Sequence, residues 1–136
     1  YGGPLIIVDF GTAITFDVVS RKGEYLGGAI SPGVQLSLEA LFENAAKLPR
    51  VELTEPRHVI GKSTIESVHS GTIHGFASLI DGMVAKIQAE LDQKARVIAT
   101  GGTVGLIVSL SNSIDIVDPF LTLEGLRIIH QRNQDG

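Results

Sequence analysis

The sequence predicts an α/β layered domain, and three features support this prediction. Apolar, β-rich stretches occur near the start, and another occurs at residues 96–100. The longest periodic segment has helical spacing and lies between them. A short helix, a last strand and a final helix follow. Alternation of strands and helices along 136 residues is typical of one layered α/β domain.

Three strands are expected within the first 32 residues. Residues 5–8 form a continuous apolar run, which is typical of a central strand buried on both faces. Residues 15–19 predict a second strand, and residues 25–30 a third after a glycine-containing turn. Gly27-Gly28 interrupts the third strand. A glycine pair there indicates close backbone approach by a neighbour or a ligand.

Two helices are expected in the middle of the chain. Residues 35–47 predict the first, which ends before Pro49, and residues 58–60 predict a short strand after it. Ser63 and Glu66 fit a capping box that starts the long helix, whose apolar face runs to Leu91. Small residues also share one face of this helix, and they predict close packing onto a sheet or a partner helix: Ser67, Gly71, Gly75, Ser78 and Gly82.

The last part of the chain continues the alternation. Residues 96–100 predict a buried strand, and residues 104–110 a short helix. Residues 114–117 predict a last strand. Residues 121–132 predict the final helix, after the turn at Asp118-Pro119.

Composition limits the classes of function. The net charge is −4, no basic cluster occurs, and we expect no nucleic-acid partner. There is no apolar run of about 18 residues and no segment that resembles a signal peptide, so we expect no membrane association. The absence of cysteine fits a reducing compartment, and a cytoplasmic location is expected. Because Met83 is the only methionine, we expect a piece of a longer protein or a processed chain.

The first candidate site is Asp9-Phe10-Gly11-Thr12. The carboxylate at the end of a strand can hold a cation, the glycine lets the backbone approach an anion, and the threonine offers a hydroxyl and an amide. A strand, a tight glycine turn and a second strand resemble the phosphate hairpin of actin-like ATPases and sugar kinases. An Asp-capped turn that binds nothing is the alternative.

A second candidate follows the strand at residues 96–100. Gly101-Gly102 leads into a helix start, where free amides and the helix dipole favour a nucleotide. An ordinary strand-to-helix turn explains the motif equally well, and the spacing is not the dinucleotide-binding G-x-G-x-x-G. The two candidate motifs together carry more weight than either alone.

Other polar motifs are weaker. Residues 61–64 (Gly-Lys-Ser-Thr) resemble the end of a P-loop, but the earlier glycine is missing because position 56 is proline. Thr64 therefore belongs either to a helix cap or to a ligand contact. The histidines are read as solvated or core-edge residues, because their spacing does not make a metal site: His58, His69, His74 and His130.

Five stretches in one order carry a family resemblance: residues 9–13, 27–33, 60–64, 100–102 and 121–126. In this order the chain resembles the C-terminal half of type III pantothenate kinases. The resemblance covers essentially all 136 residues, and the ordered combination is specific although each piece separately is not.

The resemblance implies a ribonuclease H-like (actin-like ATPase) fold, a mixed sheet with flanking helices. Residues 1–136 would then be the C-terminal domain, one half of a duplicated two-domain kinase. The implied reaction is ATP-dependent phosphorylation of pantothenate to 4'-phosphopantothenate, the first step of coenzyme A synthesis. The implied cofactors are Mg²⁺ with ATP and a monovalent cation, K⁺ or NH₄⁺, and the implied assembly is a homodimer.

The resemblance also assigns residue roles by motif. It gives Asp9 to the monovalent cation and Thr64 to pantothenate, and it gives ATP four residues: Gly11 and Thr12 on the phosphate side, Gly101 and Gly102 on the adenosine side. Ile14 stands where many members have threonine, a change of little expected effect.

The departure from the family is the missing N-terminal half. With it are missing the first phosphate loop and the Gly-x-Asp-Arg segment, whose aspartate is the expected general base. No catalytic residue is therefore assigned, and the isolated chain is expected to be inactive. Two alternatives stay open: a related small-molecule kinase, and a non-catalytic nucleotide-binding regulator or accessory factor.

Overall fold

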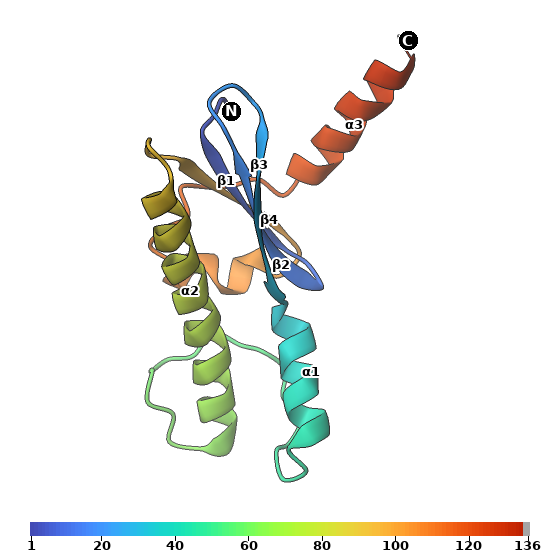
Figure 1. Cartoon of the computed structure of the whole chain (residues 1–136). Helices are drawn as coiled ribbons and strands as arrows, with labels where there is room; N and C mark the ends of the chain where they lie inside the picture. Colours follow the sequence, from blue (N-terminus) through green and yellow to red (C-terminus); the bar gives the residue numbers. More distant parts are fainter. Residues whose placement is uncertain (135–136) are drawn as a thin grey trace.

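A five-stranded mixed sheet forms the centre of the molecule in the computed structural model, which describes residues 1–134 (Figure 1). The strand order is β3-β2-β1-β4-β5. β1 pairs antiparallel with β2 and parallel with β4, so the predicted mixed sheet is confirmed. The strand bounds are β1 Leu5–Phe10, β2 Ala13–Val19, β3 Tyr25–Pro32, β4 Arg96–Gly101 and β5 Ile116–Val117.

Three α-helices flank or extend this sheet: α1 Val34–Asn44, α2 Thr64–Glu90 and α3 Leu121–Gln134. All three were expected, although α1 ends at Asn44 rather than at residue 47. The helix predicted at residues 104–110 consists of two 3-10 turns, Val104–Leu106 and Val108–Leu110. Within residues 1–134 none of the helices is long and apolar enough to span a membrane.

The main core lies between one face of the sheet and α2. Burial alternates along β1, where Ile6, Val8 and Phe10 are buried while their neighbours are half-buried. The prediction of a strand buried on both faces is therefore wrong in part. β1 is central, but α2 covers only the face that carries Val8, and Ile80 and Val84 of α2 pack there.

The two glycines of β3 were expected to mark a close approach, and Gly28 confirms it. A β-carbon on Gly28 would lie 1.9 Å from the carbonyl oxygen of Phe16 on β2. Real β-carbons do not approach backbone this closely, so the neighbouring strand accounts for this glycine.

The small residues of α2 were expected to pack onto a sheet or a partner helix. Their face points away from the sheet: all five are exposed, and a β-carbon on Gly71, Gly75 or Gly82 would meet nothing within 4 Å. Packing onto the sheet is therefore wrong for this face. A partner helix stays a prediction.

The strand predicted at residues 58–60 is wrong. These residues belong to the irregular segment between α1 and α2, with bends at Val59 and Ile60, and Ile60 is exposed. The Ser70 hydroxyl on α2 donates a hydrogen bond to the carbonyl of Val59. A side chain of α2 thus takes up a backbone group that a neighbouring strand would otherwise bind.

Candidate phosphate-binding site

The hairpin between β1 and β2 exposes its tip. Phe10 and Ile14 form the last pair, and the amide of Gly11 donates to the carbonyl of Ala13 at 3.1 Å. Gly11 and Thr12 are both exposed. The tip therefore presents a backbone with little side-chain cover and the hydroxyl of Thr12, as the sequence predicted.

The parallel register of β1 and β4 brings the two candidate motifs together. Phe10 pairs with Gly101, so both strands end at the same edge of the sheet. Gly101 has φ +106°, and a β-carbon there would lie 2.5 Å from the carbonyl oxygen of Phe10. Only glycine fits both this conformation and this contact. The turn that follows β4 therefore lies directly against the base of the hairpin.

The turn after β4 begins a 3-10 turn, not an α-helix. Gly102 is exposed, and a β-carbon there would meet nothing within 4 Å. The hydroxyl of Thr103 donates to the carbonyl of Phe10 at 3.5 Å. The expected helix dipole is thus reduced to that of one short turn. An anion at this turn would meet backbone amides and open space.

Gly33 is a fourth glycine at this edge, and the sequence argument gave it no role. It is the N-cap of α1, and its amide donates to the carbonyl of Thr12 at 2.9 Å. A β-carbon on Gly33 would lie 2.2 Å from that same oxygen. The start of an α-helix therefore abuts the hairpin tip, and its unpaired first amides add positive potential there. The glycine directly before a helix was the available signal.

Asp9 lies on the face of β1 opposite the core and is half-buried. The register pairs it with Thr15 on β2 and with Thr100 on β4. Its Oδ1 atom would lie 3.9 Å from a β-carbon on Gly11, so the carboxylate stays close to the hairpin tip. Among residues 1–134 no three His, Cys, Asp or Glu side chains cluster as metal ligands.

Thr64 is not the helix cap. The hydroxyl of Ser63 accepts from the amide of Glu66 at 3.2 Å, and the Glu66 carboxylate accepts from the amide of Lys62 at 2.7 Å. The predicted capping box is confirmed, except that Glu66 reaches one residue further back. Thr64 is the first residue of α2 and is exposed. The cap therefore leaves the Thr64 hydroxyl available for a ligand.

Thr64 lies apart from the hairpin tip, in a surface hollow of about 480 Å³ between α1 and α2. Side chains of both helices line it, with Leu38 and Leu41 on α1 and Phe76 on α2. The structure thus brings five of the six predicted site residues to one edge of the sheet and places Thr64 in this separate hollow.

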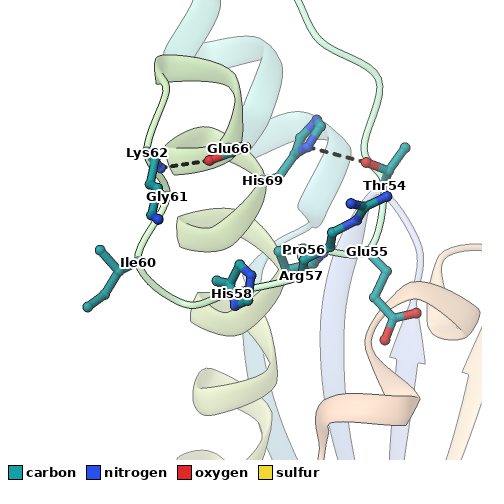
Figure 2. A pocket seen from close by; sticks show the side chains of 10 residues that line it. All are labelled: Thr54, Glu55, Pro56, Arg57, His58, Ile60, Gly61, Lys62, Glu66 and His69. Carbon is teal, nitrogen blue, oxygen red and sulfur yellow. Dashed lines mark hydrogen bonds between the residues drawn. The ribbon is translucent and has the colours of Figure 1, made fainter.

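The segment before α2 forms another hollow, of about 390 Å³ (Figure 2). Charged side chains of both signs line it, with Arg57 and Lys62 beside Glu55 and Glu66. His69 on α2 holds its wall, because its ring bonds the carbonyl of Glu52 at 2.7 Å and the hydroxyl of Thr54 at 3.3 Å. His69 therefore fixes the loop, a role that spacing alone did not indicate.

This geometry defines a class: an α/β domain whose glycine turns meet at one edge of a mixed sheet. The sequence profile of the type III pantothenate kinase family matches residues 1–86. The chain therefore belongs to the type III pantothenate kinase family.

Curated relatives agree with this family. The chain is 57% identical over 133 residues to the type III pantothenate kinase of Moorella thermoacetica, covering 98% of this chain and 52% of the relative. It is 57% identical over 129 residues to the enzyme of Myxococcus xanthus, covering 95% of this chain and 50% of the relative. The chain thus spans about half the length of the curated relatives that it matches.

A solved structure shares the fold. It is a Campylobacter jejuni protein whose description places it in the Baf family of transcriptional activators. It is similar with a TM-score of 0.68 at 22% identity, over 98% of this chain and 60% of that one. At this identity the likeness shows the fold alone.

Proposed function

We propose that the intact protein phosphorylates pantothenate with ATP and that this chain is its C-terminal domain. The observation that carries the proposal is the meeting of the hairpin tip and the turn after β4, held by the Phe10–Gly101 pair. Phosphoryl transfer depends mainly on positioning and charge stabilisation, and backbone amides at such an edge supply both. Family membership supplies the substrate class.

ATP is proposed to lie with its phosphates at the hairpin tip. The amide and hydroxyl of Thr12 and the bare backbone of Gly11 would contact phosphate oxygens, because both residues are exposed there. Gly101 and Gly102 would border the adenosine side, where the absence of side chains leaves room for the nucleoside. Mg²⁺ would enter with the nucleotide and offset phosphate charge.

The monovalent cation is assigned to Asp9, and its surroundings fit such an ion. The oxygens nearby in register belong to threonines, Thr15 and Thr100, and hard cations bind oxygen ligands. A carboxylate beside neutral hydroxyl oxygens suits a weakly held K⁺ or NH₄⁺, and the Asp17 carboxylate, which accepts from the Thr15 hydroxyl at 3.0 Å, adds negative charge nearby. The cation would add positive charge beside the phosphates.

Pantothenate is assigned to the hollow lined by Thr64. Ser63 makes the cap bond, so the Thr64 hydroxyl can meet a polar group of the substrate. The hollow is mainly apolar at Leu38, Leu41 and Phe76, which suits the aliphatic part of pantothenate.

The other half of the kinase completes the proposed site. No residue of this chain is assigned as the general base for the pantothenate hydroxyl, and the isolated chain is proposed to be inactive. The intact protein would be a duplicated two-domain kinase of the actin-like ATPase type, located in the cytoplasm. The exposed small-residue face of α2 is proposed as the homodimer contact, since Gly71, Gly75 and Gly82 permit close helix approach.

The test is an assay of the intact protein for ATP-dependent, K⁺-stimulated phosphorylation of pantothenate. Asp9→Asn is expected to abolish the K⁺ response, whereas Asp92→Asn, an exposed carboxylate after α2, should leave it unchanged. Thr64→Ala is expected mainly to raise the KM for pantothenate. Absence of turnover with pantothenate, but turnover with another acid or a sugar, would instead identify a related small-molecule kinase. Nucleotide binding without turnover on any substrate would identify a regulator.

A further inference from the structure

The Asp17 carboxylate on β2 accepts hydrogen bonds from two hydroxyl groups. The Thr15 hydroxyl, on the same strand, donates to Asp17 Oδ2 at 3.0 Å, and the Tyr25 hydroxyl on β3 donates to Asp17 Oδ1 at 3.0 Å. Burial alternates along β2: Phe16 is buried, whereas Thr15 and Asp17 on either side of it are half-buried. The cluster therefore lies on the face of the sheet opposite the core, which is also the face that carries Asp9.

The bond to Asp17 decides what the Thr15 hydroxyl can offer its other neighbours. A hydroxyl has one proton and two lone pairs, so an oxygen whose proton goes to Asp17 presents only lone pairs elsewhere. Thr15 pairs with Asp9 across the hairpin, and the β-carbons of such a directly opposed pair lie about 4.5–5.5 Å apart. A free Thr15 hydroxyl could instead donate to the Asp9 carboxylate and occupy an oxygen that a cation needs. Asp17 prevents this because it takes the proton.

A register shift between β2 and β3 places Tyr25 on the Asp17 face. The pairing shifts between Val18 and Val19, so that Tyr25, rather than Leu26, stands opposite Val19. Irregularities of this kind commonly re-aim a side chain. The hydrogen bond to Asp17 raises the pKa of the Tyr25 hydroxyl above its ordinary 10.0, so this group stays protonated and donates at neutral pH. The second carboxylate oxygen of Asp17 is thereby occupied, which fixes the orientation of the carboxylate.

We propose that Asp17 is a positioning residue for the monovalent cation. It fixes the Thr15 hydroxyl so that its oxygen ligates the ion beside Asp9, and Tyr25 in turn fixes the carboxylate. The inference rests on the proposed function in one respect, the assignment of the cation to Asp9. Asp17 pairs with Ile7, so it stands diagonal to Asp9, and diagonal positions are about 7–8 Å apart. Its effect on the ion therefore passes through Thr15.

Two other roles for the cluster make different demands on the ion. A direct ligand role for Asp17 needs no oxygen on Thr15. A purely structural role, in which the cluster ties β3 to β2, needs no ion, and the ladder between these strands already holds them together. Outer partners of metal ligands, by contrast, change metal affinity by about 10–100-fold when they are removed. Affinity for K⁺, measured apart from turnover, therefore separates the three roles.

The experiment is a K⁺ titration of the intact protein, read as the rise of its unfolding temperature. Choline chloride keeps the ionic strength constant, and a non-hydrolysable ATP analogue with Mg²⁺ is present throughout. A ligand that binds only the folded state raises this temperature according to its concentration and dissociation constant, so no turnover is required. Asp9→Asn should abolish the rise. Asp17→Asn should weaken K⁺ binding by about 10–100-fold.

Variants that keep every charge separate positioning from simple electrostatics. Thr15→Val removes the oxygen and should weaken K⁺ binding at least as much as Asp17→Asn, whereas Thr15→Ser keeps the oxygen and should retain binding. Tyr25→Phe removes one hydroxyl from an exposed side chain and should weaken binding by about threefold, the scale of one net hydrogen bond. Because this change is so small, it tests the proposal even if the Asp17 variant fails to fold. Glu24→Gln, at the exposed turn before β3, is the matched control for a lost charge and should leave K⁺ binding unchanged.

Each other outcome overturns the proposal. Unaltered K⁺ affinity in Asp17→Asn and Tyr25→Phe, with lower stability in the absence of K⁺, would leave only a tie between β2 and β3. K⁺ binding that survives Thr15→Val but not Asp17→Asn would make Asp17 a direct ligand. A K⁺ response that survives Asp9→Asn, or that is absent from the unchanged protein, would remove the ion from Asp9. Turnover of pantothenate with unaltered K⁺ affinity in these variants would refute the positioning alone, and the expected affinities without turnover would refute the proposed function alone.

Discussion

The two faces of α2 differ in what they meet. The inner face carries apolar side chains that are buried against the sheet, including Ala77, Ile80 and Val84. The outer face carries glycines around which a β-carbon would find open space. Within residues 1–134 the inner face packs on the sheet, whereas the outer face is open around its glycines and is met at Ser67 by Gly61, whose carbonyl accepts from the Ser67 hydroxyl at 3.5 Å. The contrast distinguishes the contacts of α2 that this domain makes by itself from those that a partner would have to supply.

The largest effect on stability is expected when a buried side chain on the inner face of α2 is shortened. Ile80 is fully buried in the core, so Ile80→Ala should reduce the free energy of unfolding by about 2–5 kcal/mol. Urea denaturation followed by circular dichroism measures this loss. Ile65→Ala is the matched control on the same helix, because Ile65 is 47% exposed and should cost much less. Equal losses would contradict the distinction between the faces.

The next effect concerns a glycine that does touch its neighbour. Gly101→Ala would force a β-carbon against the backbone of Phe10 at a positive φ, so it should cost about 1–3 kcal/mol of strain and displace the turn. Thermal unfolding measures the loss, and nucleotide titration of the intact protein measures the displacement. Gly102→Ala, at an open position, is the control for stability alone, because Gly102 is itself assigned to the adenosine side. If both variants keep the nucleotide affinity of the unchanged protein, this turn does not border the adenosine.

Asp81 lies at the edge of the inner face of α2, and its carboxylate should make the stability of the fold depend on pH. Burial acts to raise the pKa of Asp81, but hydrogen bonds from Ser111, Ser113 and the amides of Asn112 and Ser113 outweigh it and lower the pKa below the ordinary 3.8. The Asp81 carboxylate therefore stabilises the fold above about pH 4, and this stabilisation is lost as the pH falls through the lowered pKa. Asp81→Asn should flatten the loss of stability below pH 4 and leave the slope above pH 5 unchanged. A full acid slope in the variant would contradict this role.

The smallest effect is expected on the outer face. Gly75→Ala should stabilise the isolated chain by up to about 1 kcal/mol, because alanine is the better helix former and no neighbour is in the way. In the intact protein the same change should weaken the homodimer, as sedimentation would show. A stabilised chain with an unchanged dimer would place the homodimer contact elsewhere.

The order of strands and helices was predictable because each long element carries its own signals. The start of α2 could be placed at Thr64 because Ser63 and Glu66 make contacts within one turn. The meeting of the two glycine motifs at one edge of the sheet was partly predictable as well, since strand ends followed by glycines are local features.

The errors have a common physical origin in contacts between distant residues. The apolar run of β1 does not reveal which face a helix covers. A strand at residues 58–60 would need a partner strand, and α2 binds that segment instead. Gly33 could not be assigned a role because its constraint is the carbonyl of Thr12, which lies well before it in the sequence.

The hydrogen bond between Gly33 and Thr12 has a mechanical consequence. It joins the start of α1 to the loop that is proposed to bind ATP. Further along the same helix, Leu38 and Leu41 line the hollow beside Thr64. If nucleotide binding shifts the hairpin loop, α1 would therefore move with it and change the hollow. Substrate binding in the hollow would in turn act on the loop through α1. Such coupling is reciprocal by thermodynamic necessity, so each substrate would alter the affinity for the other by the same factor.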